Sequence, residues 1–235
     1  MKSIRYFFVL CILLAASTTA AKTANAEDSS KKRGLAFSFG TYVSNISEMN
    51  SELGANGIAE TPEWFYSIGL ISKRSIKENI FLELDGNVLI GKEAGNSLYK
   101  SSLLGSKVVA GMSYLRQGNS IDCFPTIGVG VGFTRLHIAD NSSSEYSFDE
   151  ALSNPEKELS ALNSSLLIDI GFSMEYKIKR SQNKGKGFRI GAKIGYQFAP
   201  LVSEWNMGEN ELAGGPDVGI NGYYLKMTIG KGKYN

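Results

Sequence analysis

The stretch Phe124–Ile138 reads FPTIGVGVGFTRLHI, with glycine at positions 128, 130 and 132 and bulky apolar residues between them. Alternation of this kind is typical of a β-strand, whose successive side chains point to opposite faces. One face of this strand is therefore almost bare. Glycine weakens an exposed strand because it offers nothing to pack, so the bare face needs a structural reason.

Seven further segments show the same period of two residues. Together with 124–137 they give eight predicted strands: 34–43, 63–72, 79–90, 103–115, 164–178, 187–199 and 218–230. Each covers about 10 to 15 residues, whereas strands of soluble proteins usually cover about 5 or 6. That length suits tilted strands that cross a bilayer.

The connections between these segments alternate in length. Those after the second, fourth and sixth segments are short, those after the first, fifth and seventh are long, and the one after the third is intermediate. An up-and-down barrel produces this pattern, with short turns and both termini at one end. In the long connection at 138–163, SFDEALSNPEKELSALN (147–163) predicts a small helix, since Pro155 suits a first helical position.

Charge also divides the two ends of the predicted barrel. The loop at 44–62 has Glu48, Glu52 and Glu60 and no basic residue, and the other long loops are similarly acidic. The short turns are basic and hold Lys73, Arg74, Lys77, Arg116, Arg180, Lys184 and Lys186. We therefore expect an all-β fold, an eight-stranded antiparallel up-and-down transmembrane β-barrel with long acidic extracellular loops and short basic periplasmic turns.

The first residues have the composition of a targeting segment. Lys2 and Arg5 precede an apolar run, and small residues end at Ala24-Asn25-Ala26, so a cleaved signal peptide is expected over 1–26 and the barrel domain over 27–235. The segment holds three of the 25 basic residues, which leaves 22 against 23 acidic and a net charge of −1. This balance gives no support to nucleic-acid binding. Only Cys123 remains, so no internal disulfide can form.

The less apolar face of the strands is rich in glycine and serine, which suits the lining of a narrow tube. An eight-stranded barrel has room only for its own side chains, so the bare face of 124–137 leaves space for charged groups from other strands. Enclosed charges need partners. We therefore expect a lumen ion-pair network that closes the tube, beside the small face of Gly128, Gly130 and Gly132, formed by Glu83, Asp85, Lys107, Asp169, Glu175, Arg189, Lys193 and Lys226.

The opposite face is apolar and is expected to meet lipid. It carries Phe37, Phe39, Tyr66, Ile68, Leu82, Leu84, Val129, Phe172, Tyr176, Ile194, Tyr223 and Leu225, and Trp64, Tyr114, Tyr176 and Tyr223 lie near strand ends, where interfacial aromatic girdles sit. A soluble lipocalin-like carrier would have the two faces exchanged and remains a weaker alternative.

The chain resembles the eight-stranded outer-membrane barrels of the OmpA and opacity-protein type. FPTIGVGVGFTRL is similar to a glycine-alternating middle strand of that group, and GFRIGAKIGYQFAP and NGYYLKMTIG are similar to its last two strands. The resemblance implies a cell outer-membrane location. It also implies recognition of the C-terminal strand by the barrel-assembly machinery, through Gly222, Leu225 and Met227.

Three other kinds of functional site have less support in the sequence than the lumen network. The glycines of 128–132 lack the third glycine and the helix of a dinucleotide fingerprint. His137 lies where some barrels of this size carry a lipid A-deacylating histidine, but Ala139 replaces the serine of their His-x-Ser pair. The acidic loops lack the spacing of a calcium loop. We expect no catalytic residue, cofactor or metal site.

These features favour a non-enzymatic outer-membrane barrel that serves membrane integrity, or adhesion and recognition through its surface loops. Expected partners are outer-membrane lipid, lipopolysaccharide and an extracellular ligand of the acidic loops, with no nucleic acid. A narrow ion channel or porin is the main alternative, and a lipid A-modifying barrel enzyme a more distant one.

Overall fold

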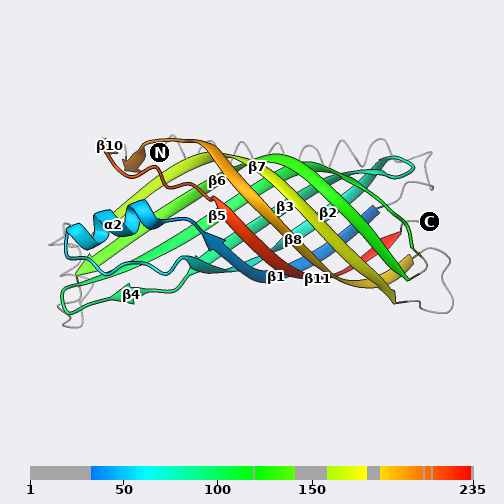
Figure 1. Cartoon of the computed structure of the whole chain (residues 1–235), viewed down its shortest axis with the longest axis horizontal. Coiled ribbons are helices and arrows are strands. Elements are labelled where there is room, and N and C mark those ends of the chain that lie inside the picture. The colour runs from blue at the N-terminus through cyan, green and yellow to red at the C-terminus, as the bar shows by residue number, and fades with distance from the viewer. Residues whose placement is uncertain are drawn as a thin grey trace.

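The computed structural model of the chain describes residues 33–118, 120–140, 158–178, 186–208, 210–212 and 214–233. The predicted signal peptide lies outside these residues. Nearly all of the described chain is β-structure (Figure 1). Among the described residues, no helix is long and apolar enough to cross a membrane.

Eight long strands form the body of the molecule. They are β1 (Arg33–Ser44), β2 (Trp64–Lys77), β3 (Ile80–Gly91), β5 (Tyr99–Tyr114), β6 (Ile121–Asp140), β7 (Glu158–Ile178), β8 (Lys186–Val202) and β11 (Gly222–Lys233). Each pairs antiparallel with its neighbours in the order β1-β2-β3-β5-β6-β7-β8-β11, and β11 pairs with β1. The ring is closed, which confirms the predicted eight-stranded barrel.

The strands run up and down between two different ends. The short connections from β2 to β3 and from β5 to β6 lie at one end, together with the start of β1 and the end of β11 (Figure 1). The connections from β1 to β2, from β3 to β5 and from β8 to β11 lie at the other. We call these the turn end and the loop end. Lys73, Arg74 and Lys77 lie within β2, so the prediction that they belong to a turn was wrong. The strand simply continues to a tighter hairpin.

The strand register fixes the shape of the tube. Followed from strand to strand through directly paired residues, the row that starts at Lys186 on β8 returns to β8 at Tyr196, ten residues further along. A stagger of this size requires strands that tilt against the barrel axis, as Figure 1 shows. The resulting tube is narrow enough for side chains to fill.

The loop end contains small elements that strand periodicity did not predict. They are α2 (Ser47–Ala55), β4 (Ala94–Gly95), β9 (Trp205–Met207) and β10 (Asn210–Leu212). Helix α2 ends at Ala55 with Asn56 as its C-cap, and Gly57 follows with φ of 69°, a left-handed conformation that glycine adopts without strain. The helix predicted at 147–163 was wrong over 158–163, which belong to β7, and its remainder lies outside the described residues.

The two faces of the wall have the predicted polarity. All the side chains expected to meet lipid are exposed except Leu84, which is half-buried; Val129 and Tyr223, for example, are 61% and 68% exposed. The charged and small residues of the other face point inward and are buried. An exposed apolar wall around a buried polar interior is the arrangement of a membrane barrel, not of a soluble carrier.

Candidate functional site

The lumen near the turn end contains an unbroken chain of alternating charges. Lys177 and Arg189 both contact Asp122, at 2.7 and 2.6 Å. Arg189 and Lys73 both contact Glu175, at 3.5 and 2.7 Å. Because each charge contacts opposite charges only, the desolvation of every ion is offset by its neighbours.

The same chain continues across the tube toward its middle. Glu83 lies 3.5 Å from Lys73 and 2.5 Å from Lys193. Asp85 lies 2.9 Å from Lys193 and 3.0 Å from Lys226, which is completely buried. Asp85 also accepts a hydrogen bond from the Asn87 amide at 2.5 Å. Nine charged residues from six of the eight strands are thereby joined, and we call them the ion chain.

The ion chain contains six of the eight residues predicted for the lumen network: Glu83, Asp85, Glu175, Arg189, Lys193 and Lys226. Sequence reasoning missed Lys73, Asp122 and Lys177. Both Lys73 and Asp122 fall in predicted turns, and the signal that could identify them is the inward parity of β2 and β6 continued to the strand ends.

The other two predicted residues lie nearer the loop end and form no ion pair with a described residue. Lys107 donates a hydrogen bond to Gln197 Oε1, and its ammonium lies 4.7 and 4.9 Å from the ring centres of Tyr42 and Tyr224. Those rings are nearly parallel, at 11°. Tyr224 in turn donates a hydrogen bond to Asp169 at 3.2 Å. Aromatic faces thus take the place of the carboxylate predicted beside Lys107.

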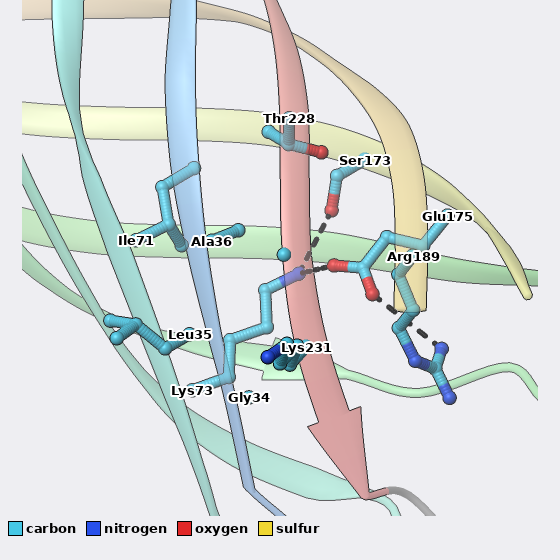
Figure 2. A pocket seen from close by; sticks show the side chains of 11 residues that line it. Gly34, Leu35, Ala36, Ile71, Lys73, Ser173, Glu175, Arg189, Thr228 and Lys231 are labelled. Carbon is cyan, nitrogen blue, oxygen red and sulfur yellow. Dashed lines mark hydrogen bonds and ion pairs between the residues drawn. The ribbon is translucent and has the colours of Figure 1, made fainter. Parts of the chain in front are cut away.

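A small cavity opens beside the ion chain at the turn end. Its volume is about 20 Å³, and β1, β2, β7, β8 and β11 line it, with Lys73, Glu175 and Arg189 on its wall. Figure 2 shows the Lys73 ammonium reaching Ser173 and Glu175 inside it. A cavity of this size holds about one water molecule, so it is too small for a solute.

Aromatic side chains cover the ion chain at the same end. Phe81 and Phe124 are completely buried and meet edge to face, with ring centres 5.9 Å apart, and Leu115 packs with them. The ammonium of Lys73 lies 3.8 Å from the ring centre of Phe124. This contact favours a cation at Lys73 and ties the aromatic layer to the ion chain.

An apolar plug fills the loop end of the tube. Met49 and Leu53 of α2, together with Trp205 and Ile220 of the last loop, pack against inward-facing apolar residues of the strands. The Trp205 indole donates a hydrogen bond to Pro216 O at 2.8 Å, and the Asn163 amide donates one to Val218 O at 2.6 Å. These hydrogen bonds hold the last loop in place, so the plug is an ordered part of the loop end.

The bare face of β6 accommodates apolar groups. A Cβ added at Gly128 would lie 2.8 Å from Val109 Cγ1, and one at Gly132 would lie 2.9 Å from Ile220 Cδ1. Val109 is also the nearest side chain to Gly130. The side chains nearest to these glycines are mostly apolar, while the charged residues Asp169 and Lys107 are the direct cross-strand partners of Gly128 and Gly132. Close approach of β5 and of the last loop requires these glycines.

His137 lies on the outward face of β6, where Ser102 and Ser160 are its direct cross-strand partners. Ser160 Oγ accepts a hydrogen bond from Arg135 Nε at 2.8 Å, and His137 Nδ1 has no hydrogen-bond partner in the described part of the chain. No nucleophile–base pair is therefore assembled there. Within the same residues, no cluster of three or more histidine, cysteine or carboxylate side chains could hold a metal ion.

Closed antiparallel pairing, an exposed apolar wall and a filled polar lumen define the class of protein: an eight-stranded transmembrane β-barrel, as the OmpA and opacity-type resemblance implied. The sequence matches no family model and no curated protein. The structure is similar to that of Ail, the attachment invasion locus protein of Yersinia pestis, at 11% identity and a TM-score of 0.42, over 86% of this chain and 96% of that one.

Two further outer-membrane structures are similar. A major outer membrane protein from Thermus thermophilus matches at 9% identity and a TM-score of 0.44, over 87% of this chain and 98% of that one. Neisserial surface protein A matches at 10% identity and a TM-score of 0.39, over 87% and 97%. The fold assignment itself rests on the closed ring of strand pairs in this chain.

Proposed function

We propose that this chain is a non-enzymatic outer-membrane protein whose barrel is a closed anchor and whose loop end acts at the cell surface. One observation carries the proposal: apolar side chains are exposed on the outside of the ring while the ion chain is buried inside. In water this arrangement would expose a continuous apolar wall to the solvent. In a bilayer the same wall contacts lipid, and the charged residues stay enclosed in the lumen.

A gel of the refolded, detergent-solubilised protein tests the anchor. Unboiled barrel should migrate differently from boiled protein and should resist proteolysis outside its loops. A protein that stays soluble without detergent, and that shows no shift on boiling, would contradict the proposal.

The filled lumen supports an anchor over a channel. A solute would have to pass the aromatic layer, the ion chain and the apolar plug in succession. Proteoliposomes in sugar solutions are therefore expected not to swell, and planar bilayers to show no steady conductance above that of the lipid. Swelling at the rate of a known porin would favour the channel instead.

Recognition is the role that the loop end supports best. The connections at 45–63 and 203–221 hold exposed acidic side chains and no basic residue: Glu48, Glu52, Glu60, Glu63, Glu204, Glu211 and Asp217. Such a surface favours a basic partner, or lipopolysaccharide phosphates held through shared divalent cations.

Two assays separate these roles. Cells that carry the variant E48Q/E52Q/E60Q should adhere less to basic matrix proteins if the loops act in adhesion. They should become more sensitive to chelator and detergent if the loops act in membrane integrity. The enzymatic alternative is tested by His137→Ala, which should leave the mass of lipid A unchanged; a mass shift that depends on His137 would contradict the proposal.

A further inference from the structure

Two arginines are directly paired at the turn end of the barrel, Arg33 on β1 with Arg74 on β2. Lys231 on β11 lies on the same outward face, directly opposite Leu35. Directly paired residues have Cβ atoms about 5 Å apart, and like charges placed directly opposite each other destabilise a sheet. The arginine pair therefore needs a counter-charge.

The described part of the protein supplies none. β11, β1 and β2 contain no aspartate or glutamate. Arg33, Arg74 and Lys231 lie on the outward face, and none of them forms an ion pair with a described residue. The basic residues of the ion chain differ in this respect, since each of them contacts a carboxylate.

Apolar surface continues from these cations toward the middle of the barrel. Lys231 is directly paired with Leu35, which is 58% exposed, and Phe37 and Leu70 follow on the same outward face. Near the ends of β5 and β7 that lie at the turn end, the outward face instead carries the exposed tyrosines Tyr114 and Tyr176. The cations thus replace the aromatic girdle on one side of the barrel, at the level of lipid headgroups.

We propose that Arg33, Arg74 and Lys231 bind the phosphate of an anionic phospholipid in the inner leaflet, with its acyl chains along Leu35, Phe37 and Leu70. The inference rests on the proposed function, because it requires the barrel to span a bilayer with its turn end on the periplasmic side. A guanidinium pair gives a phosphate two-pronged hydrogen bonding, and the exposed apolar strip matches a lipid better than a soluble acidic partner.

Native mass spectrometry of the full mature chain in detergent tests the proposal, with phosphatidylglycerol and phosphatidylcholine of identical acyl chains as probes. The test variant is R33Q/R74Q. The matched control is K92Q/K100Q, which removes two exposed charges at the loop end. Each basic residue near an anionic surface contributes a factor of about five in affinity, so the test variant should lose more than about tenfold of its preference for phosphatidylglycerol.

The control should keep the preference of the wild type. Equal binding of both lipids by the wild type would overturn the proposal, as would an unchanged preference in R33Q/R74Q or an equal loss in K92Q/K100Q. Each variant is first checked by the shift on boiling, and Lys231→Gln is measured in place of a variant that does not fold. A wild type that shifts on boiling but has no lipid preference refutes this inference alone; one that does not shift refutes the proposed function.

Discussion

Lys73 and Glu175 meet inside the lumen, with 2.7 Å between Nζ and Oε1, although they lie on β2 and β7, which are opposite strands of the ring. Glu83 on β3 and Lys193 on β8 are opposite in the same sense. These pairs act as struts across the diameter. They connect opposite strands of the ring, which share no backbone hydrogen bonds.

Replacing Lys73 with glutamine should destabilise the barrel strongly. Glu175 would keep Arg189, and Glu83 would keep Lys193, but each would lose one cation in a buried site. Breaking a buried pair from one side costs about 3 to 5 kcal/mol. Urea-induced unfolding from lipid vesicles measures the change. Lys77→Gln, an exposed position on the same strand, is the control and should have little effect.

Adding a side chain to the bare face of β6 should also destabilise the protein. In Gly132→Val the new methyl groups would collide with Ile220, Ser165 and Leu167, and overpacking of this kind costs about 1 to 3 kcal/mol. The same unfolding experiment applies. Gly86→Ala is the matched control because a Cβ there meets nothing within 4 Å. Equal effects of the two substitutions would show that close packing does not explain the glycines.

Asn50 should hold the first loop in place. Its amide donates a hydrogen bond to Thr61 O at 2.9 Å, and its Oδ1 accepts one from Thr61 N at 2.9 Å. In Asn50→Ala both backbone groups lose their partner, so the loop opens more often and a glutamate-specific protease should cleave faster after Glu52 and Glu60. Asn56→Ala, at an exposed amide, is the control. Identical cleavage rates for Asn50→Ala and the wild type would contradict a role of Asn50 in holding the first loop.

Removing the centre of the apolar plug should weaken the fold without opening the tube. Trp205→Ala leaves a cavity and strips Pro216 O of its hydrogen-bond donor, a loss of about 3 to 5 kcal/mol for a buried tryptophan. The ion chain remains, so planar-bilayer conductance should stay at the level of the wild type. Conductance that appears in this variant would mean that the plug alone closes the lumen.

The sequence predicts the barrel well because every strand shows the two-residue period along most of its length. It also predicts which residues face inward, and six of those residues join the ion chain. It does not predict which carboxylate meets which cation, because partners such as Asp85 and Lys226 are set by strand tilt and stagger. Lys107 illustrates the limit, since its aromatic neighbours come from strands far away in sequence.

The loop end was harder to predict for a different reason. The inward parity of Tyr42, Phe65, Leu89 and Leu103 places apolar side chains inside the tube, but strand periodicity does not show that loop residues pack on them. Helix α2 has only a weak amphipathic pattern, and its packing on the barrel mouth stabilises it more than its own sequence does. The formation of short elements such as α2 depends on the barrel surface on which they pack.

The struts across the lumen also impose an order on folding. Lys73 and Glu175 are 102 residues apart in the chain, Lys193 and Glu83 are 110 apart, and Lys226 and Asp85 are 141 apart. None of these contacts can form until most of the strands are present, and chains that depend on such distant contacts fold slowly. The charges must therefore stay hydrated until the last strand docks. Dehydration of the interior and closure of the seam between β1 and β11 become a single late event.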